Sequence, residues 1–377
     1  MILENQKSIF SIPSDITFLN CSYMSPMLNS VKEAAMFGLE KRGNPWKFKT
    51  DDWFGPAEEV RGLFAKIINT GKENVALAPS VSYGIATAAK NIHLTPKQKI
   101  ILLDQQYPSN VYSWRELSKE SGAEIITIKR GAEQTWTEAI LEKINEQTGL
   151  VAIPNCHWTD GSLIDLVIVS AAVKKVKAKL VIDASQSVGA YPIDVSKIKP
   201  DFLVSVGYKW LLGPYGLGYL YMDPQYATSG IPIEYGWLNK KGSEDFSKLV
   251  EYQDQYEPGA RRFDAGGFPS FIHLPMAIAG MKQLLSWGID NVQESISTVT
   301  DAIEIKAKEF GLKVPEKRTR VGHMIGVTYP LAKVAMLSKR LAEHQVFVSF
   351  RGDKIRVAPH LYNDKNDVDR LFEVLKD

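Results

Sequence analysis

The feature that most constrains this chain is the alternation, between residues 74 and 222, of short apolar runs with longer amphipathic stretches. Such runs are typical of strands buried on both faces of a parallel sheet, and the stretches between them have helical periodicity. The pattern predicts a doubly wound α/β unit. The expected strands are Asn74 to Ala78, Ile100 to Leu103, Ala123 to Ile128, Leu150 to Ile153, Leu180 to Asp183, Phe202 to Val206 and Gly218 to Met222.

Helices are expected between these strands and on either side of them. Ser30 and Glu33 have capping-box spacing before an Ala-rich stretch that ends at Gly43. After about residue 255 the pattern changes to that of a smaller α+β domain, with alternating runs at 321–328 and 345–358. The other expected helices cover 56–68, 82–92, 109–121, 134–146, 165–176, 270–287, 291–310 and 331–344, followed by a terminal helix from Asp364.

Charge and cysteine content limit the classes of function. Lys and Arg total 45 against 43 Asp and Glu, with no basic block, so a nucleic-acid partner is not expected. Cys21 and Cys156 are the only cysteines and lack metal-ligand spacing, so neither a disulfide framework nor a metal site is expected. No leader and no long apolar span is visible. We expect a cytoplasmic protein that acts on a small molecule and binds no membrane.

The segment from Leu180 to Met222 carries the strongest chemical signal. Asp183 ends one expected strand and Lys209 follows the next, where open α/β sheets place their ligands. An enzyme that uses pyridoxal 5′-phosphate (PLP) needs this pair: a Lys to form the Schiff base, and a carboxylate to hold the pyridinium nitrogen protonated. Taken singly the residues are weak evidence, since strand-end Asp residues also serve phosphate and metal sites and most lysines are simply solvated.

Motifs for competing functions are missing from the sequence. GPYGLG after Lys209 does not open a helix as GxGxxG would, and neither GxxxxGK[ST] nor HExxH occurs. The nucleotide-binding and zinc-protease interpretations therefore have no motif to support them.

This segment resembles the class V aminotransferase family of PLP enzymes, which includes cysteine desulfurases, kynureninase and isopenicillin-epimerase-like proteins. The family's D-x-x-Q motif is Asp183 to Gln186, its Lys is Lys209, and its glycines follow at Gly213, Gly216 and Gly218. The resemblance extends from FLNCSYM, near Leu19, to the terminal helix. It implies that Gln186 hydrogen-bonds the ring oxygen of the cofactor.

The resemblance also implies a phosphate site and a residue that stacks on the cofactor ring. APSVSYGIATAA matches the family's phosphate loop, so Val81 and Ser82 are expected to donate to the phosphate at a helix N-terminus. Ser82 has the alternative of being a simple N-cap. Tyr107 in QQYPSNVYSW aligns with the stacking residue, and Tyr208 replaces the family's common His while keeping a hydroxyl for the phosphate.

In the C-terminal region, KIRVAPHLYND resembles the family motif whose Arg holds the substrate α-carboxylate, which assigns that role to Arg356. Arg suits the task because its planar fork makes two parallel bonds to a carboxylate. Arg351, five residues earlier, is the competing candidate. Trp158 in NCHWTDG replaces an Asn near the ring, and its indole N–H could donate or its ring could pack.

RRFDAGGFPS resembles the segment by which one subunit of a family dimer reaches the phosphate of the other, with Gly266 and Gly267 at the key positions. Relatives often carry Thr where this chain has Gly267, so only a backbone donor remains there. The resemblance implies a homodimer.

The family fold is that of aspartate aminotransferase. We expect a large PLP domain over 15–258, with a mostly parallel seven-stranded sheet, and a small α+β domain over 259–377 that also receives the arm 1–14. The leading function is an aminotransferase with an amino-acid substrate. Alternatives are a C–S lyase or β-eliminase, an epimerase, and a catalytically silent binding protein, which Lys209 and Asp183 disfavour.

Cysteine desulfurase activity is not expected, because that reaction needs a cysteine nucleophile on a C-terminal loop. The stretch from 320 to 356, including VFVSFRGDKIR, contains no cysteine. Cys21, in the loop FLNCSYM, is the one exception to consider, and as a small buried residue it would be inert.

Overall fold

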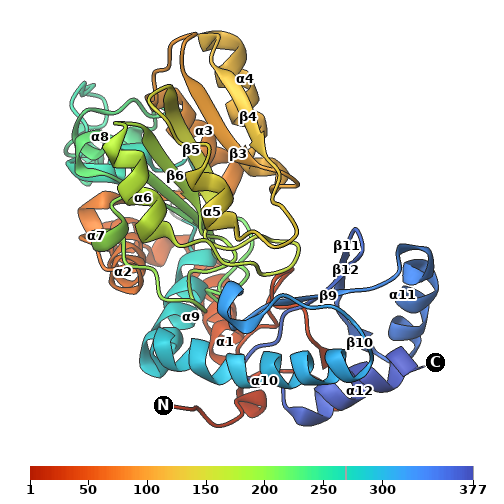
Figure 1. The fold of residues 1–377 in the computed structure, drawn as a ribbon. Helices are drawn as coiled ribbons and strands as arrows, with labels where there is room; N and C mark the ends of the chain where they lie inside the picture. The colour runs from red at the N-terminus through yellow and green to blue at the C-terminus, as the bar shows by residue number, and fades with distance from the viewer. Residues whose placement is uncertain (268–269, 377) are drawn as a thin grey trace.

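A seven-stranded sheet forms the centre of the computed structural model, which describes residues 1–267 and 270–376. The strand order is β2-β8-β7-β6-β5-β3-β4, and Figure 1 labels β3, β4, β5 and β6 of this sheet. All neighbours from β7 to β4 are parallel, and β8 runs antiparallel to both β7 and β2. The predicted doubly wound, mostly parallel sheet is confirmed. The strands are β2 (Val75–Ala78), β3 (Lys99–Leu103), β4 (Glu124–Ile128), β5 (Thr148–Pro154), β6 (Lys179–Asp183), β7 (Phe202–Val206) and β8 (Gly218–Met222).

Alternate side chains of the central strands enter two separate hydrophobic cores. In β3, Ile101 and Leu103 join one core, whereas Ile100 and Leu102 join the other. Because both faces are covered, the strands consist almost wholly of apolar residues. The covering helices are α1 (Asn29–Arg42), α2 (Thr50–Ile67), α3 (Val81–Asn91), α4 (Tyr112–Ser121), α5 (Trp136–Leu141), α6 (Leu166–Lys175), α7 (Val195–Ile198), α8 (Pro224–Ser229) and α9 (His273–Trp287).

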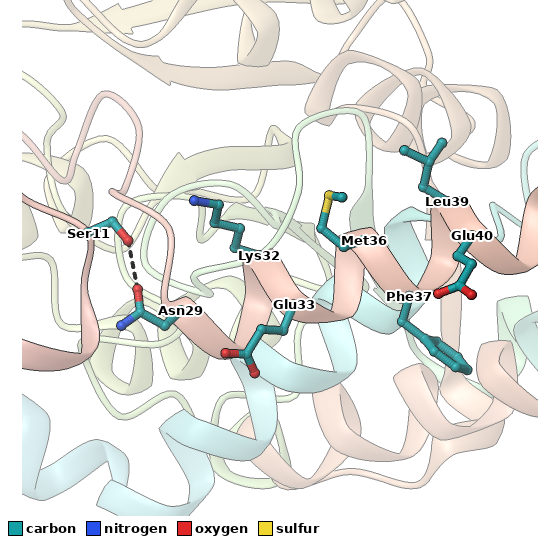
Figure 2. Close-up of a pocket in the computed structure, with 8 residues that line it drawn as sticks. All are labelled: Ser11, Asn29, Lys32, Glu33, Met36, Phe37, Leu39 and Glu40. Carbon is teal, nitrogen blue, oxygen red and sulfur yellow. Dashed lines mark hydrogen bonds between the residues drawn. The ribbon is translucent and has the colours of Figure 1, made fainter.

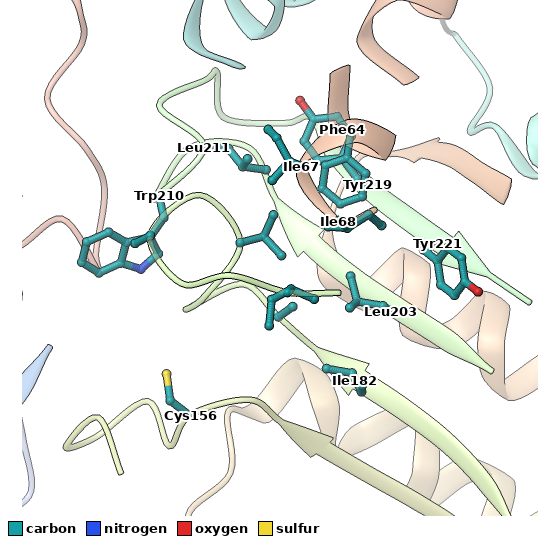
Figure 3. Close-up of a cluster of buried hydrophobic side chains, with 14 of the residues drawn as sticks. Phe64, Ile67, Ile68, Cys156, Ile182, Leu203, Trp210, Leu211, Tyr219 and Tyr221 are labelled. Carbon is teal, nitrogen blue, oxygen red and sulfur yellow. The ribbon is translucent and has the colours of Figure 1, made fainter. Parts of the chain in front are cut away.

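The larger core continues from the sheet into α2. The rings of Phe64 on α2 and Tyr219 on β8 stack with centroids 4.3 Å apart (Figure 3). At the end of the sheet, the same view shows Trp210 and Cys156 extending beyond the strands. This end of the sheet is where the chemically important residues gather.

Three predicted helix boundaries are wrong, and one of them is the start of α2, which lies at Thr50 rather than near residue 56. The Ser30–Glu33 capping box does not form, because α1 begins at Asn29 and Leu28 is the N-cap residue. A bridge between Leu28 and Phe10 holds the chain at this point, so tertiary pairing sets the start of the helix. Helix α5 ends at Leu141 rather than near 146, since β5 already begins at Thr148.

The C-terminal region forms a smaller sheet with its own core. Its strands β9 (Ile325–Thr328), β11 (Ser349–Arg351) and β12 (Lys354–Val357) are antiparallel in the order β11-β12-β9. A separate pair joins β1 (Thr17–Phe18) to β10 (Val346–Phe347). The helices are α10 (Ile289–Glu309), α11 (Val334–Glu343) and α12 (Lys365–Lys376), gathered at one end of the molecule (Figure 1).

The first residues of the chain contact this C-terminal region. The amino group of Met1 pairs with Glu294 of α10 at 2.7 Å, and Gln6 N donates to Leu361 O at 2.8 Å. The division of the chain at residues 258 and 259 stays a prediction. Because α9 packs against α1 and α2, we propose that the boundary follows α9, near Gly288.

A buried ion pair joins α2 to the segment after residue 259. Arg61 and Asp264 are 3% and 4% exposed, and Arg61 Nη1 donates to Asp264 Oδ1 at 2.8 Å. The same carboxylate oxygen accepts from Leu77 N of β2 at 2.8 Å. The pair therefore fixes the segment of Gly266 to the edge of the sheet.

Replacing Asp264 by Ala should lower the free energy of unfolding by about 3–5 kcal/mol, because Arg61 would lose its fully buried counter-ion and keep only the partly exposed Glu58, and because Leu77 N would lose its acceptor. Urea unfolding of the purified protein measures the loss. The control is Asp245→Ala, whose partner Lys248 lies 3.3 Å away on the surface, and it should leave the unfolding midpoint in place. A stable Asp264→Ala variant would contradict the assigned role of the pair.

Candidate active site

A small pocket lies at the carboxyl ends of β5, β6 and β7. Open α/β sheets bind their ligands at this edge. Elements distant in the sequence contribute its walls: the loop after β3, the ends of β5 and β6, and the loop after β7. The lining residues are Gln106, Tyr107, Asn110, Pro154, Cys156, Trp158, Asp183, Ser185, Gln186 and Lys209.

Asp183 is the last residue of β6 and is 6% exposed. Burial raises the pKa of its carboxyl group, while the backbone hydrogen bond from Ser185 and the charge of Lys209 act against that rise. Ser185 N donates to Asp183 Oδ1 at 3.0 Å. A positive group bound in this pocket would keep the carboxylate ionised.

Lys209 faces the same pocket and is 7% exposed. Burial lowers the pKa of its amine to about 8, against the attraction of Asp183, and the charges of Arg356 and Arg351 lower it further. Its Nζ lies 5.5 Å from the ring centroid of Tyr107 and 5.7 Å from that of Tyr208. An amine with this pKa is largely neutral just above pH 8, as a nucleophile must be.

Close backbone packing presents Lys209 to the pocket. Gly207 N donates to Leu217 O and Gly213 N donates to Gly207 O, both at 2.9 Å, which closes the loop between β7 and β8. A Cβ on Gly189, whose φ is +105°, would lie 2.2 Å from Trp210 O. Only glycine allows the chain after β6 to approach the backbone next to Lys209 so closely.

Gln186 is held by residues that the sequence motifs did not indicate. Its Oε1 accepts from Trp210 Nε1 and its Nε2 donates to Ser22 O, both at 3.0 Å. The backbone oxygen of Gln186 lies 2.6 Å from His323 Nε2. His323 is 137 positions away in the chain and belongs to no motif, so the sequence carried no signal for this contact.

At the predicted phosphate site, Ser80 rather than Ser82 caps α3. Tyr83 N donates to Ser80 Oγ at 3.2 Å, which leaves the hydroxyl of Ser82 exposed at the helix N-terminus, 3.0 Å from Ser80 Oγ. Val81 is the first helical residue and is buried. The simple N-cap alternative for Ser82 is therefore wrong.

Gly266 and Gly267 lie beside this end of the sheet. Ala265 N donates to Leu77 O at 3.0 Å, which ties the segment to β2 just ahead of the predicted phosphate loop. Gly266 N donates to the carboxylate of Glu234. Gly267 is exposed and has φ +73°, a conformation that Thr would adopt only with strain.

Arg356, on β12, enters the site from the smaller sheet. It is 1% exposed, and its Nη1 donates to Trp158 O at 2.9 Å. Burial lowers the pKa of its guanidinium to about 9. Trp158 both donates and packs: its Nε1 bonds Gln105 O at 2.6 Å, and its ring meets Tyr107 edge to face at 5.5 Å.

Both cysteines are fully buried. Cys156 lines the pocket, which its sequence position did not suggest, and its Sγ lies 3.6 Å from Gln186 O. Burial raises the pKa of the Cys156 thiol to about 12 and raises that of Cys21 as well. Neither thiol is ionised near neutral pH, so neither is a ready nucleophile.

The pocket walls carry polar groups without partners. Among the described residues nothing hydrogen-bonds the buried lining atoms Asn110 Nδ2 and Ser185 Oγ, or Arg356 Nε, whose guanidinium lies beside the lining residue Trp158. Buried polar atoms are normally satisfied, so unpartnered ones in the pocket wall are free to bind a polar ligand. An amine, a carboxylate and free donors around one small pocket fit a cofactor such as PLP.

Comparison with known proteins assigns the family. The family model described as aminotransferase class-V matches residues 54–371. The chain belongs to this family. It is 27% identical over 378 residues to an uncharacterized aminotransferase, YcbU, of Bacillus subtilis (strain 168), covering 97% of this chain and 95% of that one. A probable cysteine desulfurase of Pyrococcus abyssi is 26% identical, over 85% of this chain and 82% of its own.

Solved structures share the architecture. An apo cysteine desulfurase from Thermococcus onnurineus NA1 matches with a TM-score of 0.85 at 18% identity, covering 100% of this chain and 98% of that one. The cystine C–S lyase C-DES, solved with its product cysteine persulfide, matches with a TM-score of 0.86 at 17% identity over 96% and 97% of the two chains. The predicted PLP-dependent transferase fold is confirmed, and the family's cofactor is PLP.

Two further properties of the chain concern membrane-spanning helices and metal sites. Within residues 1–267 and 270–376, no helix is both long enough and apolar enough to cross a bilayer. In that same part of the chain, no set of His, Cys, Asp and Glu side chains is arranged to hold a metal ion.

The lowered pKa of Lys209 predicts how apoenzyme takes up PLP. The rate of covalent uptake should rise with pH and be half-maximal near pH 8, because the amine reacts only when deprotonated. An ordinary lysine, with a pKa of about 10.4, would still be gaining reactivity at about pH 10. Stopped-flow absorbance of the cofactor measures this rate.

Lys209→Ala is the control, and it should remove the covalent phase. Borohydride reduction of the wild-type holoenzyme, followed by peptide mapping, should place the pyridoxyl group on Lys209. A midpoint near that of free lysine, or an adduct on another lysine, would refute the assignment.

Proposed function

We propose that this chain is a PLP-dependent aminotransferase acting on an amino acid, with Lys209 as its catalytic residue. The single observation that carries the proposal is the placement of Lys209 and Asp183 in one buried pocket, with the pKa of the amine lowered to about 8. An amine that changes protonation near neutral pH can both accept and return a proton. Family membership supports the reaction class.

The residues around the pocket have separate roles in holding the cofactor. Asp183 pairs with the ring nitrogen, Gln186 donates to the ring oxygen, and Tyr107 packs on the ring. Exposed donors at the start of α3 receive the phosphate. The groups we assign to the phosphate are Val81, Ser82, Tyr208 and, from the other subunit of a dimer, Gly267 and Gly266, whose N–H would first have to leave the carboxylate of Glu234.

The chain's own groups then orient the substrate and move its proton. When bound, PLP withdraws electrons from the substrate Cα, which makes the proton on that carbon removable. Arg356 binds the α-carboxylate and so fixes the position of Cα. Lys209 Nζ would remove the Cα proton. It would then return a proton to the carbon of the cofactor that had carried the aldehyde. Trp158 and Tyr107 cover the pocket and limit the access of water.

Elimination, C–S cleavage and epimerisation begin with the same removal of a proton, so these alternatives share the site. Cysteine desulfuration needs an additional thiolate. The absence of cysteine from 320–356 and the raised pKa of both buried thiols argue against that reaction. Aminotransfer needs no group beyond those already in the pocket.

Incubating the holoenzyme with single amino acids and cysteine derivatives should convert the cofactor to pyridoxamine phosphate, with one equivalent of keto acid and no ammonia. Absorbance spectra and keto-acid, ammonia and sulfide assays follow the products. Asp183→Asn is the matched variant and should bind PLP while turning over slowly, because an amide does not stabilise the protonated ring. Ammonia with an unchanged cofactor, or a persulfide on Cys156 or Cys21, would replace aminotransfer by elimination or desulfuration.

We also propose that the enzyme is a homodimer. A shallow pocket runs along α1, where Met36, Phe37 and Leu39 are 60%, 63% and 54% exposed (Figure 2). Neighbouring apolar side chains on one exposed helix are typical of surfaces that become buried by association. A second copy suits this face because most soluble oligomers are two-fold symmetric.

Light scattering should give twice the monomer mass for the holoenzyme, and the double substitution Met36→Glu with Phe37→Glu should reduce it to one monomer mass at the same protein concentration. The control is Leu331→Glu, since Leu331 is 67% exposed but lies in the C-terminal region. A wild-type enzyme that is monomeric and fully active would refute both the dimer and the cross-subunit role of Gly266 and Gly267.

A further inference from the structure

Two arginines of the smaller sheet lie against the same indole ring at the edge of the site. The guanidinium carbon of Arg351 is 4.9 Å from the ring centroid of Trp158, and that of Arg356 is 5.8 Å away. Trp158 itself lines the pocket that contains Lys209. The side chain of Trp158 therefore lies against two arginines and also lines the pocket of Lys209.

Strand register explains why both side chains reach this place. In the β11–β12 hairpin, Arg356 is directly opposite Ser349, and Arg351 follows Ser349 by two positions. Side chains two apart on a strand point to the same face, so Arg351 and Arg356 are diagonal neighbours on it. Gly352, with φ +59°, makes the tight turn that keeps Arg351 in this register.

Neither arginine has an anionic partner among the described residues. Arg356 donates to Trp158 O and, at 3.4 Å, to Ser349 Oγ, whereas Arg351 donates to Phe350 O at 2.6 Å. All of these acceptors are neutral. The Nε atoms of both arginines are buried and have no partner in this part of the chain.

Two neighbouring cations without a counter-ion destabilise the folded protein. The presence of both Arg351 and Arg356 at this place therefore has to be explained. Like charges repel, and a buried charge loses hydration that only an opposite charge or hydrogen bonds restore. The nearby carboxylate of Asp160 is turned to another arginine, since it lies 3.7 Å from Arg130 Nη2. A ligand that carries negative charges would supply the missing counter-ions.

We propose that the substrate is a short-chain amino dicarboxylic acid, with its α-carboxylate on Arg356 and its side-chain carboxylate on Arg351. This proposal rests on the proposed function, because it takes Lys209 as the group that meets the substrate amine. Each guanidinium has an unpartnered Nε and can bind a carboxylate through two parallel bonds. The face of Trp158 holds both cations in place.

The alternative role for Arg351 is packing alone. A side chain that only covers Trp158 would affect every ligand of the pocket to the same extent. A side chain that binds the second carboxylate discriminates between ligands with one and with two carboxylates. The two roles therefore differ in selectivity, which can be measured without turnover.

The test is calorimetric titration of the holoenzyme with succinate and with propionate, neither of which has an amino group to react. Wild type should bind succinate about 10-fold to 100-fold more tightly than propionate, the range that a hydrogen bond between charged groups supplies. Arg351→Gln should abolish that preference and leave propionate binding unchanged. Arg351→Lys should restore part of it, because a point charge replaces the fork.

Two further variants separate carboxylate binding by Arg351 from the packing of its stem and from a general loss of positive charge. Arg351→Met keeps the apolar stem of the side chain and should behave as Arg351→Gln does. Arg370→Gln removes one positive charge from a residue that, like Arg351, donates to backbone oxygens, here those of Asp15 and His344, and it should retain the preference for succinate.

Equal binding of the two acids by wild type, or an equal loss of both in Arg351→Gln, would overturn the proposal. The outcome is separate from that of the aminotransferase assay. Succinate selectivity that depends on Arg351, in an enzyme that eliminates rather than transaminates, would support the dicarboxylate site while refuting the reaction. Transamination of monocarboxylic amino acids at full rate by Arg351→Gln, with aspartate and glutamate no better in wild type, would refute the site and keep the reaction.

Discussion

The arrangement of this site depends on the burial of one amine opposite one carboxylate. Lys209 and Asp183 leave water together, and each alters the proton affinity of the other. Burial leaves a larger fraction of this amine neutral near pH 8 than in a surface lysine, because the charged form loses hydration. Burial acts on Asp183 in the opposite sense and favours its protonated form. A cationic group bound beside the carboxylate would keep Asp183 ionised. The charge of Asp183 is therefore fully balanced only when a cationic ligand occupies the pocket.

Hydrogen bonds between residues with no proposed catalytic role hold Lys209 and Asp183 in place. Asp183 ends β6, and three residues later the side chain of Gln186 bonds Trp210, which follows Lys209 directly. The loop bearing Lys209 is thereby tied to the strand bearing Asp183. His323 joins the same network from the C-terminal region by meeting the backbone oxygen of Gln186. A displacement of the C-terminal region would thus reach the pocket through the hydrogen bonds of His323 and Gln186.

The sequence predicted what depends on local pattern. Phe202–Val206 and Gly218–Met222 have the bounds that their apolar runs indicated, and Asp183 and Lys209 meet because strand ends meet at one edge of a parallel sheet. Contacts set by tertiary structure could not be predicted in this way. Trp210, His323 and Cys156 join the site through packing between distant segments. Leu28 displaced Ser30 as the N-cap of α1 for a similar reason, since a bridge to Phe10 outweighs the capping preference of a serine.

Trp158 shows how a departure from the family pattern acquires a physical meaning once the structure is known. An Asn at this position would offer one amide to a ligand. The indole N–H of Trp158 donates to Gln105 O, so only its ring face is left to contact other groups. The aromatic ring attracts two guanidinium groups and also meets Tyr107 in a T-shaped contact, which an Asn could not do. With Trp in place of Asn, a direct hydrogen bond to the ligand is lost, and the ring instead positions Arg351 and Arg356 of the β11–β12 hairpin. Because those charges come from the smaller sheet and the ring comes from the loop after a strand of the larger one, the proposed dicarboxylate site lies where the two parts of the molecule meet.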